Sequence, residues 1–484
     1  MQTLNPEPQT QVIVNGTPEV APGVVFIEAQ QRRMPANAPG KGSSPFGAVG
    51  SLIDLSPMDH QHPGPLDISN YKNSNGVAAG KGGNDTQAFA SMYKDFIATG
   101  APMRVGVGTY YVNFQEAFVV PPGAQYAPAP KMQGDGVDVT KIICTNSSGA
   151  AFNFDVGNAD GTYNVQWMGY IKDLTLDGQN IGFDAIRFHR SYFMSLERVR
   201  VKNFLNYGIH FRVEDSVSGD KDACQWVRFV DVTIESCRAW GIIADNPASS
   251  AFNQTAYLYV QNVWVTKCGV NMGANVDNSG AGSPYMDPAS ATTVIPTSGG
   301  IKWKGQGLSG DNLVISECPN VGLYVYADGH GQAFYVNLRN LDCENNCYGV
   351  WIDGCLHFNV SIFRNHHSST YVGKSALVVN GVSSLSDLLH VDHVDLLADA
   401  TLCPNYVAFD SNANLNAIGM EILHGRWQTD PVGLQTDFGY HLQTNRNRTR
   451  FTEFLRTGNN RNYDRAYNIN NIPNTASDTA DGTS

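Results

Sequence analysis

Aromatic and charged side chains alternate with apolar ones in short segments between residues 207 and 353. Successive side chains of a strand point to opposite faces, so Ile209 and Phe211 should face inward and their polar neighbours outward. Trp and Tyr rings can stack on sugars, and charged groups can bind sugar hydroxyls or carboxylates. We therefore predict a glycan-binding face made of His210, Arg212, Lys302, Lys304, Tyr324, Tyr326 and Trp351. A solvated sheet face and a surface buried between subunits are the alternative readings.

Carboxylates near the same outward positions could cleave a glycosidic bond. Hydrolysis needs two carboxyl groups, about 5–5.5 Å apart for retention and about 6.5–9.5 Å for inversion. Asp353 and Asp328 occupy similar places in neighbouring repeats, which predicts Asp353 as acid or nucleophile and Asp328 as its partner. Asp245 lies three repeats from Asp353, about 14 Å at sheet spacing, and would need Glu214 or Asp215 as a partner.

Elimination is the alternative chemistry, and the sequence does not choose between it and hydrolysis. It needs a base beside a uronate whose acidity is raised by a cation or metal. Lys302, Lys304, Tyr326 and His330 could serve, and Ca2+ is expected as a cofactor only in this case. His330 lies between two glycines, and a turn that requires glycine explains that motif equally well.

These side chains must be positioned by a repeated element. Short apolar alternations recur, and a second strand that usually starts at Gly follows most of them. The step varies, with 33 residues from Val201 to Ile234 and 19 from Cys343 to Ile362. Short strands, a variable period and no intervening helices predict a parallel β-solenoid. The units are Leu174–Leu176, Val199–Val201, Val232–Ile234, Val263–Val265, Leu313–Ile315, Leu341–Cys343 and Val360–Ile362.

Two further columns of polar residues are interpreted as structural. Residues directly before each unit are mostly Asp or Asn, which can hydrogen-bond to one another at a turn. They are Asp173, Arg198, Asp231, Asn262, Asn312, Asn340 and Asn359. Outward acids and bases on or just after the same strands should form surface ion pairs. These are Glu235, Glu317 and Glu344 with Lys202, Lys267 and Arg364.

Segments of different composition flank the repeats. Residues 1–74 are rich in Pro and Gly and predict an arm or attachment segment. A helix starts after Asn84 or Asp85, with Phe89, Met92, Tyr93 and Phe96 on one face. The repeats occupy 75–456, with an insertion at 271–298 that would wall the glycan-binding face, and 457–484 form a flexible tail.

Composition excludes several classes of protein. Net charge is −12, which argues against binding to nucleic acid. The sequence has no apolar run of the ~18 residues that a membrane span needs, and no cleavable signal peptide is visible. The nine cysteines are an odd number, so they cannot all form disulfides, and their spacing does not match a metal site. Most are therefore interpreted as buried apolar residues. Pairs such as His366 and His367 lack a third ligand, so no metal centre is predicted.

Three segments together resemble the entry to pectate-lyase-like right-handed β-helices, in which a capping helix and a Gly-Thr-Tyr strand precede the coils. They are 84–89 (Asn-Asp-Thr-Gln-Ala-Phe), 108–112 (Gly-Thr-Tyr-Tyr-Val) and 171–178 (Ile-Lys-Asp-Leu-Thr-Leu-Asp-Gly). The resemblance covers about 75–455 and implies an all-β right-handed parallel β-helix with an N-terminal capping helix and extended terminal segments.

That superfamily includes polysaccharide lyases, glycoside hydrolases, epimerases and bacteriophage tailspike depolymerases. The N-terminal arm and the absence of a visible signal peptide favour the tailspike branch. The resemblance then implies a homotrimer at the virion surface or outside the cell, attached through the arm and cleaving a bacterial polysaccharide. A secreted bacterial lyase or epimerase and a non-catalytic glycan-binding virion protein are the alternatives.

Overall fold

The computed structural model describes two units separately, Met1–Gln61 and His62–Ser484. In the first unit it describes β1 (Ile13–Val14) and β2 (Thr17–Pro18), which pair antiparallel. In the second unit it describes residues 64–119, 129–154, 156–157, 163–164, 166–189, 191–212, 224–244, 255–269, 298–326, 335–353, 355, 357–366, 375–379, 388–397, 405–409, 419–428, 440–442 and 448–457. Within these residues no helix is long and apolar enough to cross a membrane.

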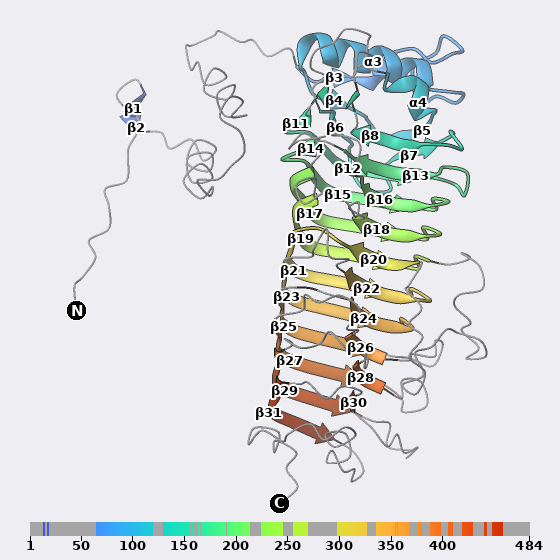
Figure 1. Ribbon diagram of the computed structural model, residues 1–484. Helices are drawn as coiled ribbons and strands as arrows, with labels where there is room; N and C mark the ends of the chain where they lie inside the picture. Colours follow the sequence, from blue (N-terminus) through green and yellow to red (C-terminus); the bar gives the residue numbers. More distant parts are fainter. Residues whose placement is uncertain are drawn as a thin grey trace, which may run out of the picture. The chain divides into compact units, whose positions relative to one another are not determined.

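The second unit is built mainly from two parallel sheets whose strands alternate along the chain (Figure 1), and a small antiparallel pair, β9 (Val156–Gly157) and β10 (Tyr163–Asn164), lies outside them in the strand order. The 17-stranded sheet, here the long sheet, contains β12 (Tyr170–Asp177), β15 (Ser195–Lys202), β17 (Cys224–Glu235), β19 (Thr255–Thr266), β21 (Gly307–Ser316), β23 (Tyr335–Glu344), β25 (His357–His366), β27 (Leu388–Leu397), β29 (Gly419–Gln428) and β31 (Arg448–Thr457). Its N-terminal strands are β3 (Leu66–Asp67), β4 (Met103–Arg104), β5 (Gly108–Val112), β6 (Lys131–Gln133), β7 (Thr140–Cys144), β11 (Gln166–Trp167) and β14 (Ser191–Tyr192).

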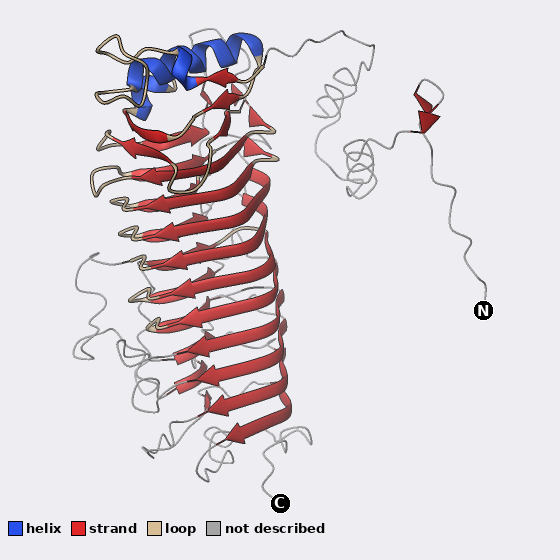
Figure 2. Cartoon of the chain, turned by 180° about the vertical axis from the view of Figure 1, so that it is seen from behind, coloured by secondary structure: helices blue, strands red, loops and turns tan. Residues whose placement is uncertain are grey.

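The 10-stranded sheet, here the short sheet, contains the second strand of each coil. Its strands are β8 (Ala150–Phe154), β13 (Asp184–Phe188), β16 (Tyr207–Phe211), β18 (Trp240–Ala244), β20 (Gly299–Trp303), β22 (Val321–Tyr326), β24 (Tyr348–Asp353), β26 (Ser375–Val379), β28 (Asn405–Phe409) and β30 (Tyr440–Leu442). Each strand pairs with the equivalent strand of the next coil, as Figure 2 shows from the other side. This confirms the predicted right-handed parallel β-helix.

A helix covers the N-terminal end of the stack (Figure 1). Helix α3 (Thr86–Thr99) begins where Asn84 Oδ1 accepts a hydrogen bond from Thr86 N, and it ends at Gly100 in the left-handed conformation. The predicted apolar face is confirmed, because Phe89, Met92 and Phe96 are fully buried and Tyr93 nearly so. Short helices η1 (Ile68–Asn70) and α4 (Phe114–Ala117) complete this end, which leaves the first strands without an open edge.

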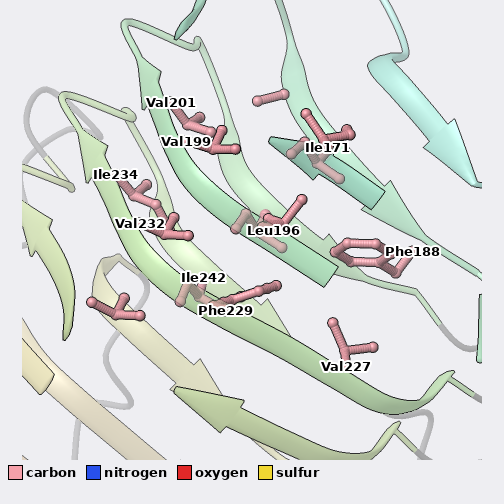
Figure 3. Close-up of a cluster of buried hydrophobic side chains, with 14 of the residues drawn as sticks. Ile171, Phe188, Leu196, Val199, Val201, Val227, Phe229, Val232, Ile234 and Ile242 are labelled. Atoms are coloured by element: carbon pink, nitrogen blue, oxygen red, sulfur yellow. The ribbon is translucent and has the colours of Figure 1, made fainter. Parts of the chain in front are cut away.

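The interior is a continuous apolar core between the two sheets (Figure 3). Inward residues repeat at the same place in successive coils, as Val199 pairs with Val232 and Val232 with Val263. Cys237, Cys268 and Cys318 occupy the turn after these residues and are fully buried, as predicted. The eight described cysteines are all free thiols.

Glycines that start the second strand have a packing role. A Cβ on Gly241 would lie 2.3 Å from Val265 Cγ1 and 2.8 Å from the carbonyl oxygen of Gly300. A Cβ on Gly208, Gly300 or Gly322 would lie 2.6 Å from the equivalent carbonyl oxygen of the next coil. Only glycine fits this corner because each coil's backbone approaches the next one there.

Long-sheet strands bend at the predicted Asx column. Asp173, Arg198, Asp231, Asn262 and Asn312 have φ between 51° and 59°. Asn262 donates to Asp231 at 2.9 Å, and Asn312 donates to Asn262 at 3.0 Å, which confirms this part of the column.

The predicted register holds as far as Cys343, because Leu313 pairs with Leu341 and Ile315 with Cys343, although Asn340 donates its hydrogen bond to Asp311. Beyond Cys343 the predicted register is wrong, because Cys343 pairs with Asn365, so this step has 22 residues (343 to 365) rather than 19. The apolar triplet Val360–Ile362 imitates the repeat three residues too early.

The β-helix begins before the predicted boundary at residue 75. Leu66 and Asp67 of β3 already pair with β4, and Ile68 is fully buried in the core. At the other end, β31 runs to Thr457. The predicted insertion at 271–298 lies outside the described residues except for Ser298, and the tail after Thr457 lies outside them entirely.

Candidate functional site

Several residues of the predicted glycan-binding face share one row on the short sheet. His210 pairs with Ile243, and Lys302, Tyr324 and Trp351 follow it in register. Tyr326 lies two residues further along its strand and pairs with Asp353. The parallel register therefore brings these residues together from coils far apart in the sequence.

Much of this face is covered. Tyr324, Trp351 and Lys304 are each 1% exposed. Tyr324 stacks with Trp240 at 6.3 Å between ring centroids, and Trp351 makes an edge contact with Tyr348 at 4.9 Å. A stacking platform needs an open ring face, so the two rings form a packed layer in this arrangement.

One part of the face combines cations with a phenol. The ammonium groups of Lys302 and Lys304 lie 4.9 and 5.4 Å from the centroid of the Tyr326 ring. Tyr326 also stacks on Tyr324, at 5.1 Å. Two cations beside a phenol are groups that proton abstraction from a uronate could use.

His210 belongs to a buried ionic cluster around Asp184. Asp184 accepts hydrogen bonds from Arg187 at 2.7 Å and from Asn206 at 2.8 Å, and His210 Nδ1 lies 3.7 Å from its carboxylate. Burial alone would raise the pKa of Asp184, but His210 and Arg187 outweigh it and hold that pKa below its ordinary value. This cluster is structural, because Asp184 also accepts a bond from the Tyr207 backbone at 3.3 Å.

The remaining predicted residues lie at the ends of short-sheet strands or outside the described residues. Arg212 is half-buried, and its backbone N–H donates to the Phe188 carbonyl at 2.8 Å. Asp353 is placed by its backbone alone. The predicted catalytic residues Asp245, Asp328 and His330 lie outside the described residues, as do Glu214 and Asp215.

A second set of reactive groups lies on the outer face of the long sheet. Asp342 and Glu344 are two apart on β23, and His366 follows Glu344 in register on β25. One donor atom from each of these three side chains lies within 4.8 Å of the others. All three are half-buried. Two carboxylates at this separation suit glycoside hydrolysis with retention better than with inversion.

The same three side chains could also supply ligands to a divalent cation. Among the described residues, they form a cluster of His, Asp and Glu side chains close enough together to hold a metal ion. Two carboxylates with an imidazole suit a transition metal better than Ca2+, which takes oxygen ligands.

The other outward glutamates of this face differ from Glu344. Glu235 pairs with Arg200 at 2.8 Å, and Glu317 pairs with Lys267 at 3.5 Å. Only the Lys267 pair matches the predicted ladder, because Lys202 pairs with Asp177 instead, at 3.6 Å. Glu344 has His366 Nδ1 at 3.9 Å, and Arg364, which the sequence placed in the same ladder, lies in register with Asp342.

An exposed tryptophan lies on the same face. Trp264 is 49% exposed, and its indole donates to Ser316 Oγ at 2.9 Å. Ser316 pairs with Glu344 in the next coil, and Val314 pairs with Asp342. This set was not predicted from the sequence because Glu344 was assigned to a surface ion pair. Asp342 and Glu344 flank the inward Cys343, and this alternation could have placed both acids on the outer face.

No protein-family model matches the sequence, and no curated protein matches it. Solved structures do. The A-module of the mannuronan C-5 epimerase AlgE4 from Azotobacter vinelandii is 12% identical, with a TM-score of 0.50 over 82% of this chain and 97% of the module. This chain has the parallel β-helix fold. The resemblance stated from the sequence is thus confirmed for the fold.

Other solved structures that match have lower TM-scores. The tailspike protein of E. coli bacteriophage HK620, solved in complex with a pentasaccharide, is 10% identical with a TM-score of 0.46, over 80% of this chain and 66% of the tailspike chain. PfbA, a surface adhesin of Streptococcus pneumoniae, is 10% identical with a TM-score of 0.41, over 82% of this chain and 93% of PfbA. At such identities the likeness concerns the fold alone.

Proposed function

We propose that this β-helix is an enzyme that cleaves a polysaccharide by glycosidic hydrolysis at Asp342 and Glu344. The supporting observation is the separation of their carboxylate oxygens, within 4.8 Å on an accessible face. Retaining hydrolysis uses two carboxyl groups about 5–5.5 Å apart. One protonates the leaving oxygen, and the other attacks the anomeric carbon before water releases the sugar.

Elimination on the short sheet is the second candidate. It is favoured by the two lysines that lie 4.9 and 5.4 Å from the Tyr326 ring centroid. Lys302 and Lys304 would neutralise a uronate carboxylate, and Tyr326 in its phenolate form would take the C5 proton. The C4–O bond would then break, and the leaving oxygen would take a proton from water. Asp353 and Asp328 would be needed only for hydrolysis at that face. Burial of Lys304 requires this face to open before a glycan can enter.

The resemblance to tailspikes also leads us to propose an oligomeric state and a location. A tailspike-like role predicts a homotrimer outside the cell or on a virion, with the arm that precedes β3 as the attachment segment. Light scattering of the full chain tests this, because a monomeric mass would contradict the tailspike role.

Mass spectrometry of released oligosaccharides tests the reaction. Capsulated bacteria on which the protein forms a clearing halo supply the polysaccharide. Hydrolysis adds one water per cleaved bond, whereas elimination leaves a 4,5-unsaturated end. We expect saturated products, formed equally well in EDTA because two carboxyl groups complete the chemistry without a metal. Unsaturated products would move the site to Lys302, Lys304 and Tyr326.

A further inference from the structure

Trp264 has an unusual setting for an exposed aromatic residue. Nearly half of its surface is exposed, on a sheet face whose neighbouring coils present charged and hydroxyl groups. A single exposed apolar residue is common at protein surfaces and needs no explanation by itself. Trp264 differs because its orientation is fixed.

A chain of hydrogen bonds fixes the indole. Trp264 Nε1 donates to Ser316 Oγ at 2.9 Å, and Ser316 Oγ donates to Thr266 Oγ1 at 2.9 Å. Ser316 is 2% exposed and Thr266 6% exposed, so the anchor is shielded from water. Because Ser316 belongs to the next coil, the ring must lean from β19 across β21, in the direction of β23.

This direction leads to the carboxylate pair. Ser316 and Val314 lie in register with Glu344 and Asp342, one strand away. Adjacent strands are about 4.8 Å apart, which is close to the length of one sugar ring. A glycan that runs across the strands, along the helix axis, would therefore place one ring at the carboxylates and the next ring over the indole.

We propose that Trp264 forms a stacking subsite for the pyranose next to the ring that is cleaved, with Ser316 as its positioning residue. This inference rests on the proposed hydrolysis at Asp342 and Glu344. The expected ligand is a pyranose that presents an apolar C–H face, since such a face packs on an indole. The subsite fixes the direction of the bound chain, along the helix axis over β19, β21 and β23.

Kinetics on the polysaccharide that the wild type clears provide the first test. Trp264→Ala should raise KM about 10-fold, which corresponds to the loss of roughly 1.4 kcal/mol of stacking, and should change kcat little. Trp264→Phe should recover part of this loss, and Ser316→Ala should raise KM about 3-fold. Tyr259→Ala is the matched control, since Tyr259 is a 40% exposed aromatic on the same strand. Equal KM values for Trp264→Ala and Tyr259→Ala would overturn the inference.

A binding test separates this inference from the proposed reaction. The probe is a printed array of bacterial surface polysaccharides, and the parent protein is the full-length Asp342→Asn variant. Adding Trp264→Ala should remove the array signals of this parent, whereas adding Tyr259→Ala should keep them. Signals that survive Trp264→Ala, or a parent that binds nothing, would contradict the subsite. Failure of the proposed reaction would appear differently, as turnover by Asp342→Asn itself.

Discussion

Asp184 shows how one buried charge depends on its neighbours. Its carboxylate is almost fully buried and is compensated by Arg187 and His210. Because the folded pKa is lower than the ordinary value of about 3.9, this group stabilises the fold above about pH 4. That stability is lost as the pH falls through the folded pKa.

Asp184→Asn should therefore flatten the acid side of the stability curve. The melting temperature of the wild type should fall between pH 5 and pH 3, and the variant, less stable at pH 7, should fall less over the same range. Differential scanning calorimetry measures both curves. Parallel curves would show that Asp184 does not carry the acid sensitivity.

Asn365 is a buried polar residue that the core does not satisfy. It is fully buried at an inward position beside Cys343, and neither of its amide atoms has a hydrogen-bond partner among the described residues. A buried polar group without a partner costs about 1–3 kcal/mol. Asn365→Leu, which has the same branched shape, should raise the free energy of unfolding by about that amount in urea titrations. A lower free energy would mean that the amide is satisfied in solution.

Among the elements, the corner glycines explain why the second strand of each coil starts as it does. Gly241→Ala would force a methyl group against Val265 and the Gly300 carbonyl. Overpacking of this kind costs about 1–3 kcal/mol, and we expect that loss in the free energy of unfolding. Gly64→Ala is the control, because nothing lies within 4 Å of its Cβ position. Equal stabilities would show that the coils can move apart at the corner.

The elements also show how far sequence reasoning reaches. Alternation, the Asx column and the capping helix predicted the fold because they are local patterns repeated many times. Register after Cys343 was wrong because Val360–Ile362 matches the repeat as well as the true segment does. That shift of three residues hid the neighbourhood of Glu344 and His366. Burial of Tyr324 and Trp351 was equally inaccessible, since alternation separates two faces but does not say what covers the outer one.

At the scale of the whole molecule, the coil stack protects its thiols. Burial raises the pKa of Cys144 to about 11 and of Cys355 to about 12, and it raises those of Cys318 and Cys343 well above the ordinary range. The side-chain hydrogen bond with Cys268, together with burial, does the same for the pKa of Cys237. Of nine cysteines, the eight described ones are buried. The folded protein should expose no more than one thiol per chain to Ellman's reagent at pH 8, and all nine in guanidinium chloride. Several reactive thiols in the folded state would mean that the coils open readily.

The whole molecule presents two faces that could act on a glycan, and comparison of three variants decides between them. Asp342→Asn and Glu344→Gln remove groups of the long-sheet pair, while Asp353→Asn removes the carboxylate predicted for the short sheet. Rates of oligosaccharide release should fall about 100- to 10,000-fold for Asp342→Asn and Glu344→Gln and stay near wild type for Asp353→Asn. Full activity of Asp342→Asn and Glu344→Gln, with loss in Asp353→Asn, would contradict hydrolysis at the long-sheet pair.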